Sequence, residues 1–493
     1  MSPIAVTITI IAYFALLFTV SYIAGRKADN EGFFVGNRKS SWYVVAFAMI
    51  GSTISGVTFV SVPGMVGSSC FSYLQMVLGF IVGQFIIAFI LVPLFYRMNL
   101  VSIYEYLENR FGTSSYRTGA WFFFISKMLG AAVRLFLVCL TLQLLVFEPF
   151  HLPFILNVAI TVALVWLYTF RGGVKSLIWT DSLKTFCLVV SVVLCIYYIA
   201  SDLKLNFGGL VNTISDSDLS RIFFFNDIND KRYFFKQFLA GVFTVIAMNG
   251  LDQDMMQRNL SCKNFRDSQK NMITSSISQF FVILLFLMLG VLLYTFVAQQ
   301  GLTAPSKSDE LFPMIATSSY FPGIVGILFI IGLVSSAYSA AGSALTALTT
   351  SFTVDILHAK SKEEATLSKL RKRVHISMAV VMGIVIFVFG LLNNTSVIDA
   401  IYTLASYTYG PILGLFAFGI FTKKQINDKY IPFVAILSPI LCYILQSNSE
   451  AWFNGYQISY ELLILNAFFT FLGLCLLIKR NEKHVVSATR TIK

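Results

Sequence analysis

Charged residues are scarce in this sequence. Only 12% of the 493 residues are charged and 57% are hydrophobic, whereas about 25% of the residues of a soluble domain are charged. The mean hydropathy is +0.76. Apolar stretches of about 18 residues or more recur along the whole chain, and each can cross a bilayer core of roughly 30 Å as a helix. This composition excludes a soluble enzyme and a disordered chain, and it predicts an all-α polytopic protein embedded in a lipid bilayer.

Cysteine and histidine are also sparse. The seven cysteines are scattered without a CxxC pair, and the four histidines share no spacing typical of metal ligands. The cysteine pattern therefore excludes a disulfide framework and a zinc knuckle. The apolar spans contain no paired carboxylates, metal cluster or nucleophile–base pair, so we expect neither enzymatic activity nor an organic cofactor.

Polar and charged segments divide the chain into thirteen predicted spans, at residues 4–24, 42–66, 72–96, 118–147, 152–169, 177–201, 236–257, 271–299, 322–352, 374–392, 397–420, 430–447 and 459–478. Most of the 36 Lys and Arg residues lie in alternate connections on one side. Basic residues are enriched in cytoplasmic connections, so we expect the N-terminus outside and the C-terminus in the cytoplasm, in the plasma membrane (the inner membrane of a bacterium). Topology thus accounts for the net charge of +12, which requires no nucleic-acid partner.

A few ionisable residues lie within the predicted spans, where they are costly and usually functional. Lys127, Arg134 and Lys184 are basic, and Asp181 is the clearest carboxylate. A side chain that snorkels to the membrane interface accounts for the presence of Lys127 in its span as well as a buried role does. Snorkelling accounts less well for Arg134 and Lys184, because they lie deeper in their spans. Asp181 and Lys184 are three residues apart and share a helix face, so they can form an ion pair at depth.

Two spans have an unusual composition for membrane helices. Residues 51–64 and 240–254 both carry glycine together with hydroxyl or amide side chains in mid-span. Helix packing through small residues explains the glycines but not Ser55, Thr58 and Ser61. The two spans lie five spans apart and begin on opposite sides of the membrane. This arrangement predicts two discontinuous helices that belong to inverted repeats and enclose a binding site.

This interpretation divides the chain into five parts. They are an N-terminal helix with the first cytoplasmic loop at 1–41, the first repeat at 42–201, an extracellular loop at 202–235, the second repeat at 236–420, and two C-terminal helices with a cytoplasmic tail at 421–493.

Five motifs occur in the order and on the spans expected of the solute:sodium symporter family, at residues 42–64, 171–181, 252–258, 335–355 and 407–411. The sequence resembles this family nearly from end to end. The resemblance implies a leucine-transporter-type fold, in which one helix precedes a 5+5 inverted-repeat core and two helices follow it. It also implies sodium-coupled import of a small polar organic solute by alternating access, and we expect a functional monomer. The run from Ser52 to Pro63 resembles sialic-acid and sugar-type members, which favours a sugar, a sugar acid or another organic anion.

The resemblance also implies a sodium ion between the first and eighth core helices. By motif, the backbone carbonyls of Gly51 and Ile54 are ligands, and Asp181 lies near the cation route. Lys184 stands where many relatives carry an amide, and its ammonium can take the place of sodium. This substitution leaves an alternative open, namely a sodium-independent or proton-coupled carrier that uses Asp181 and Lys184.

The eighth core helix offers two registers for the remaining sodium ligands. Ser335 and Ser336 resemble the expected hydroxyl pair. The spacing to the acidic helix end at residues 353–355 instead favours Ser339 and Ala340, with Ser336 supplying a carbonyl. In this second register, which we prefer, the chain departs from the family because Ala340 lacks the second hydroxyl.

Five polar residues are candidates for substrate binding. Ser55 and Thr58 lie three residues apart on the first broken span, and Gln75, Arg134 and Asn249 lie on three further spans. Arg134 can bind a carboxylate with two parallel hydrogen bonds, which favours an organic anion as the substrate. The alternative is a structural arginine that binds backbone carbonyls at the cytoplasmic gate.

Overall fold

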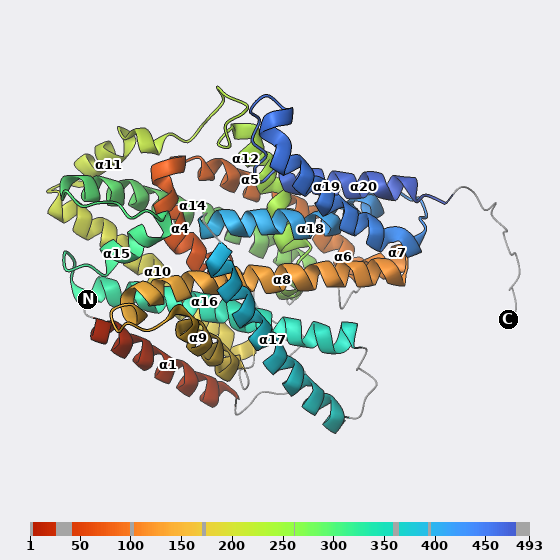
Figure 1. The fold of residues 1–493 in the computed structure, drawn as a ribbon, viewed down its shortest axis with the longest axis horizontal. Coiled ribbons are helices and arrows are strands. Elements are labelled where there is room, and N and C mark those ends of the chain that lie inside the picture. Colours follow the sequence, from red (N-terminus) through yellow and green to blue (C-terminus); the bar gives the residue numbers. More distant parts are fainter. Residues whose placement is uncertain are drawn as a thin grey trace, which may run out of the picture.

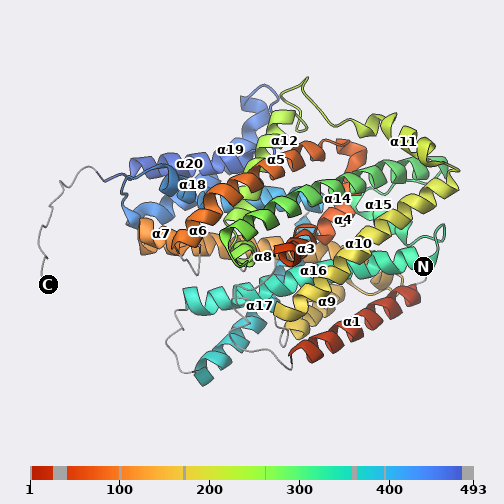
Figure 2. The same ribbon diagram turned by 180° about the vertical axis from the view of Figure 1, so that it is seen from behind.

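The computed structural model describes residues 3–25, 42–98, 103–169, 174–260, 262–357, 364–392 and 396–479, and within these ranges the chain is helical without a β-strand. Most helices run along the long axis of the molecule (Figures 1 and 2). The central helices α8 (Thr113–Leu142), α16 (Gly323–Ser351) and α18 (Val397–Phe421) pack side by side. α1 (Pro3–Gly25) flanks the bundle against α16, and α20 (Leu462–Leu476) packs against α18.

The other helices complete the bundle around this centre. Their bounds are α3 (Trp42–Thr53), α4 (Gly56–Ser69), α5 (Tyr73–Ile86), α6 (Val92–Met98), α7 (Glu105–Arg110), α9 (Phe154–Thr169), α10 (Val174–Asp202), α11 (Phe207–Ser215), α12 (Phe234–Val245), α13 (Gln253–Leu260), α14 (Phe265–Gln299), α15 (Leu311–Ala316), α17 (Glu364–Leu392) and α19 (Ile431–Trp452). Among the described residues, four π-helical segments continue helices, at Ile87–Leu91, Gln143–Phe147, Ile246–Gly250 and Phe352–Ile356, and three short 3-10 turns lie at Asp218–Ser220, Ser308–Glu310 and Asp428–Tyr430.

Every predicted span coincides with one of these helices or with a pair of them. In the described part of the chain, seven helices are long and apolar enough to cross a membrane, and an eighth is obtained if the bent pair α10–α11 counts as one span. The prediction of a polytopic α-helical membrane protein is therefore confirmed. The number of thirteen crossings stays a prediction, because this count covers only the described residues.

The first predicted discontinuity is present between α3 and α4. Helix α3 ends at Thr53 and α4 begins at Gly56, with Ile54 and Ser55 outside the helical conformation. Ser55 has an extended backbone (φ −80°, ψ 163°), and its hydroxyl accepts a hydrogen bond from the Thr58 N–H at 3.3 Å. Serine is a favoured N-cap because its side chain satisfies a free N–H of the first turn. The local sequence therefore restarts the helix at membrane depth.

The second predicted discontinuity lies between α12 and α13. The π-helical segment Ile246–Gly250 ends α12, and Leu251 and Asp252 are not helical. The Asp252 carboxylate then accepts a hydrogen bond from the Met255 N–H at 3.1 Å and caps α13. π-helical segments are frequent at functional sites. The residue bounds of the two repeats, 42–201 and 236–420, stay a prediction.

Glycines allow α5 and α12 to pack in direct backbone contact. A Cβ atom at Gly79 would lie 2.1 Å from the Phe238 carbonyl oxygen, and one at Gly241 would lie 2.1 Å from the Met76 carbonyl oxygen. Small residues drive helix association in lipid, since burial of apolar side chains contributes little there. This contact holds α12, the first part of the second broken helix, against α5.

Candidate functional site

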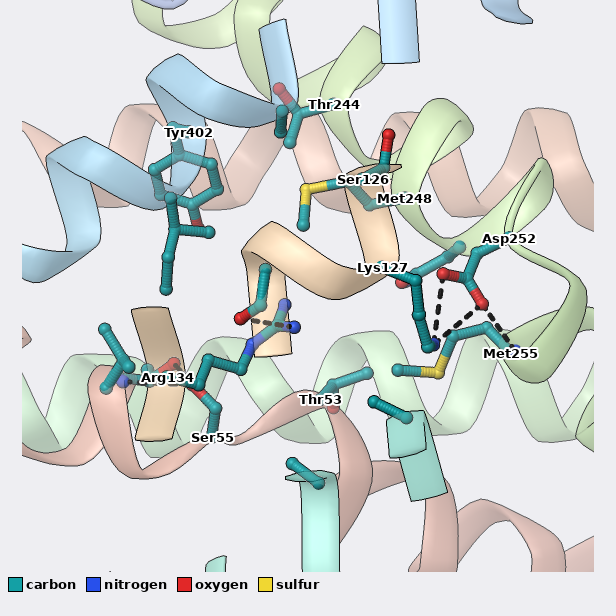
Figure 3. Close-up of a pocket in the computed structure, with 18 of the residues that line it drawn as sticks. Thr53, Ser55, Ser126, Lys127, Arg134, Thr244, Met248, Asp252, Met255 and Tyr402 are labelled. Carbon is teal, nitrogen blue, oxygen red and sulfur yellow. Dashed lines mark hydrogen bonds and ion pairs between the residues drawn. The ribbon is translucent and has the colours of Figure 1, made fainter. Parts of the chain in front are cut away.

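A cavity of about 160 Å³ lies between the two helix breaks. Its walls come from α3 and α4, from α8, from the π-helical segment and α13, and from α16 and α18 (Figure 3). The cavity therefore forms where the predicted discontinuous helices meet the centre of the bundle.

Arg134 extends from α8 into this cavity (Figure 3). Its one described hydrogen bond is long, 3.4 Å from Nη1 to the carbonyl of Gly130 in the preceding turn. In the described part of the chain, no carboxylate lies within ion-pair distance of the guanidinium. Because an uncompensated charge is costly at membrane depth, this geometry favours an anionic partner in the cavity.

Three other candidate residues line the same cavity. The hydroxyls of Ser55 and Thr58 lie 3.3 Å apart on the first broken helix, and both residues line the cavity together with Arg134. Asn249 lies in the π-helical segment of the second broken helix, and its amide makes no hydrogen bond with the described residues. The structure thus brings Ser55, Thr58, Arg134 and Asn249 together from three separate elements.

Gln75 lies elsewhere. Its Nε2 donates to the Arg232 carbonyl at 2.8 Å and to the Ser72 carbonyl at 3.3 Å, and its Oε1 accepts from the Phe224 N–H at 3.3 Å. The side chain is fully buried and is not part of the cavity wall. These contacts indicate that Gln75 holds the connection 202–235 in place, and its role in substrate binding stays an untested prediction.

Helix α16 presents several of the expected cation ligands to the cavity. Ser336, Ser339 and Ala340 line it, whereas Ser335 does not. The hydroxyls of Ser335 and Ser336 are both buried without a hydrogen-bond partner, and the Ser336 side chain lies beside Gly56 at the first helix break. Leaving a buried hydroxyl unsatisfied costs about 1–3 kcal/mol, so these residues fit a small cation that binds oxygen.

The other predicted cation residues are only partly described. Ile54 is buried at the first helix break, where its carbonyl lies outside regular helix. Gly51 lies on α3, and Asp181 and Lys184 lie on α10, but the surroundings of Gly51 and the side chains of Asp181 and Lys184 lie outside the described part of the structure. The proposed Asp181–Lys184 pair and the replacement of sodium by Lys184 therefore stay predictions.

Sequence reasoning missed a charge cluster at one end of the cavity. The Lys127 ammonium lies 3.2 Å from an oxygen of Asp252 and 3.1 Å from an oxygen of Asp254. The side chains of Lys127 and Asp252 are only 10% and 5% exposed. Snorkelling of Lys127 is therefore wrong, because two carboxylates satisfy the ammonium inside the bundle. The signal available in the sequence was the pair of aspartates at the second break.

Two discontinuous helices that meet at a polar cavity, with a part-buried guanidinium in its wall, are typical of a secondary transporter. The model of the sodium:solute symporter family matches residues 33–429, and the chain belongs to this family. It is a sodium-coupled symporter of a small organic solute and not an enzyme.

The relatives agree with this assignment. The sodium/sialic acid symporter NanT of Aliivibrio fischeri is 26% identical over 91% of this chain and 89% of its own length. The corresponding symporter SiaT of Proteus mirabilis is 24% identical over 83% of both chains. The solved structure of a Na⁺-coupled sialic acid symporter in a substrate-bound outward-open state superimposes with a TM-score of 0.78 at 20% identity, covering 96% of this chain and 97% of that chain. This similarity confirms the leucine-transporter-type fold.

Proposed function

We propose that this symporter imports a small organic anion with a carboxylate group, of the sialic-acid or sugar-acid type. The observation that carries the proposal is the Arg134 guanidinium, which lines the cavity without a described carboxylate partner. A guanidinium binds a carboxylate through two parallel, charge-assisted hydrogen bonds. Ser55, Thr58 and Asn249 supply hydroxyl and amide groups for the hydroxyls of the solute.

We further infer that sodium binds between the first helix break and α16. Its ligands are the Gly51 and Ile54 carbonyls, the Ser336 carbonyl and the Ser339 hydroxyl, and Asp181 lies along its route. A cation that bridges two helices stabilises the arrangement in which both contribute oxygens. Entry of one sodium ion releases about 2.3 kcal/mol per 100 mV and about 1.4 kcal/mol for a tenfold gradient, which together support roughly 500-fold accumulation.

The proposed setting follows from the distribution of basic residues. The N-terminus lies outside, the C-terminus lies in the cytoplasm, and the protein acts as a monomer in the plasma membrane, which is the inner membrane of a bacterium. The binding residues all come from one bundle, so a second copy is not needed to build the site.

Uptake by proteoliposomes tests the proposal. Labelled sialic acid is offered with an inward sodium gradient, with a proton gradient instead, and with or without an inside-negative voltage. We expect accumulation only with sodium, enhanced by the voltage, and competition by other sugar acids but not by a neutral sugar of similar size. Equal competition by the neutral sugar would contradict carboxylate recognition, and uptake driven by the proton gradient alone would contradict the sodium site.

A further inference from the structure

The charge cluster of Lys127, Asp252 and Asp254 connects four elements of the bundle. Lys127 belongs to α8, and the two aspartates flank the start of α13. Tyr409 of α18 donates a hydrogen bond to Asp252 at 2.9 Å. Ser343 of α16 donates to the two Asp254 oxygens at 3.2 and 3.3 Å. The cluster therefore locks the second helix break to three helices that line the cavity.

The cluster closes one end of the cavity. Lys127 precedes Arg134 by seven residues on α8, which places both on one helix face two turns apart. Helix α8 follows α7, so Lys127 is nearer the α7 end of the bundle. Figure 3 shows Tyr402 on one side of Arg134 and the Lys127–Asp252 pair on the other. The cluster therefore lies between a substrate bound at Arg134 and the α7 end of the bundle.

We propose that Lys127, Asp252 and Asp254 form the gate through which solute and sodium leave toward the α7 end, which is cytoplasmic in the proposed orientation. A buried ion pair is costly to break while it stays dry, because each charge then loses its partner. Water that enters on opening hydrates the separated charges and removes this cost. The cluster thus has two stable arrangements, one closed and dry and the other open and hydrated. This inference rests on the proposed transport cycle.

The same contacts connect the gate to the proposed sodium site. Ser343 lies four residues after Ser339 and seven after Ser336, so the three side chains follow one face of α16. Ser336 and Ser339 line the cavity beside the first helix break, and Ser343 binds Asp254. A shift of α16 on sodium release therefore moves the hydroxyl that stabilises the gate.

Cysteine labelling tests the gate without knowledge of the substrate. Met248 lines the cavity, and Met248→Cys provides a reporter in a background where the half-buried Cys70 and Cys475 are changed to serine. A membrane-impermeant maleimide is applied separately to right-side-out and inverted vesicles. Lys424→Cys identifies the α7 end, because Lys424 is exposed and its carbonyl accepts a hydrogen bond from Arg110 of α7 at 2.9 Å.

We expect Lys127→Met to raise labelling of the reporter from the α7 end about tenfold, since the two carboxylates lose a charged hydrogen-bond donor and repel each other. Lys424→Met, which removes an exposed lysine at the same end, leaves the rate unchanged. Tyr409→Phe retains the ion pairs and gives a smaller increase, and it replaces Lys127→Met if that variant does not fold. No increase with either variant overturns the gate. If the proposed substrate or sodium site is wrong, the uptake assay gives a different result from the one expected, but the labelling result stays the same. The two assays therefore test the gate and the proposed function separately.

Discussion

The hydroxyls of Tyr73 and Tyr402 lie 2.6 Å apart and join α5 to α18 across 329 positions of sequence. Tyr402 lines the cavity, and its ring packs against Tyr460 at 5.1 Å between centroids. Tyr402 lies on the side of Arg134 away from Lys127 (Figure 3), so we expect this contact to restrict access to the cavity from the opposite end.

Tyr73→Phe removes the hydrogen bond and keeps the ring. We expect faster labelling of the Met248→Cys reporter from the end opposite α7, because a typical hydrogen bond contributes about 1 kcal/mol, close to a fivefold change in the open population. Tyr197→Phe is the control, since that tyrosine is 62% exposed on α10. An equal response of both variants would show that the Tyr73–Tyr402 contact does not restrict access.

Arg134→Lys keeps the charge and loses the planar pair of donors. If Arg134 binds the carboxylate of the solute, the KM for uptake rises about tenfold or more, because lysine cannot replace a bidentate arginine. Arg266→Lys, at an exposed position on α14, controls for the substitution itself. An unchanged KM in Arg134→Lys would assign Arg134 a structural role, in which it binds the Gly130 carbonyl of its own helix.

Substitutions on α16 decide the register of the sodium site. Ser339→Ala removes a proposed ligand, so we expect the sodium concentration for half-maximal uptake to rise about tenfold. Ala340→Ser adds a hydroxyl, so we expect this concentration to fall severalfold. Ser335→Ala leaves it unchanged, because Ser335 does not line the cavity. A large effect of Ser335→Ala together with a silent Ser339→Ala would support the other register.

Asp309, in the connection between α14 and α16, makes stability depend on pH. One oxygen accepts a hydrogen bond from the Val397 N–H at 2.8 Å, and the other is buried without a hydrogen bond. Burial raises the pKa of Asp309, and the nearby Asp399 and Glu310 add to this. The raised pKa means that its contribution to stability is present below the ordinary value near 4 and is lost as the pH rises through the folded-state pKa.

Asp309→Asn should therefore be more stable than the parent at neutral pH, and its stability should change less between pH 4 and pH 8. Thermal unfolding in detergent across this range measures both effects. Lower stability of Asp309→Asn at pH 7, with an unchanged pH profile, would show that the ionised carboxylate is favoured in the fold.

Gly241→Ala tests the close packing of α5 and α12. The new Cβ would lie 2.1 Å from the Met76 carbonyl oxygen, so the two backbones must separate. We expect a loss of about 1–3 kcal/mol of stability, as is typical of overpacking, in thermal or denaturant unfolding. Gly323→Ala is the matched control because nothing lies within 4 Å of its added Cβ, and an equal loss there would assign the effect to the helix backbone alone.

The two interruptions could be predicted because their causes are local. The N-cap serine at position 55 and the polar run around Asp252 are visible in the sequence, and both helices break there. Gln75 illustrates the limit. A polar residue in an apolar span predicts a partner, but only packing decided that the partner is the backbone at Arg232, 157 positions away.

Hydropathy, helix breaks and family motifs are properties of contiguous residues, so the sequence by itself determined the membrane class, the helical spans and the discontinuous helices. Which charges meet is a property of the packed bundle. Lys127 finds Asp252 at a separation of 125 residues, while Arg134, two turns further along the same helix, faces the cavity. The sequence treats both as costly cations in the membrane. Only the neighbouring helices decide that Lys127 is neutralised by two carboxylates, whereas Arg134 has no carboxylate partner among the described residues.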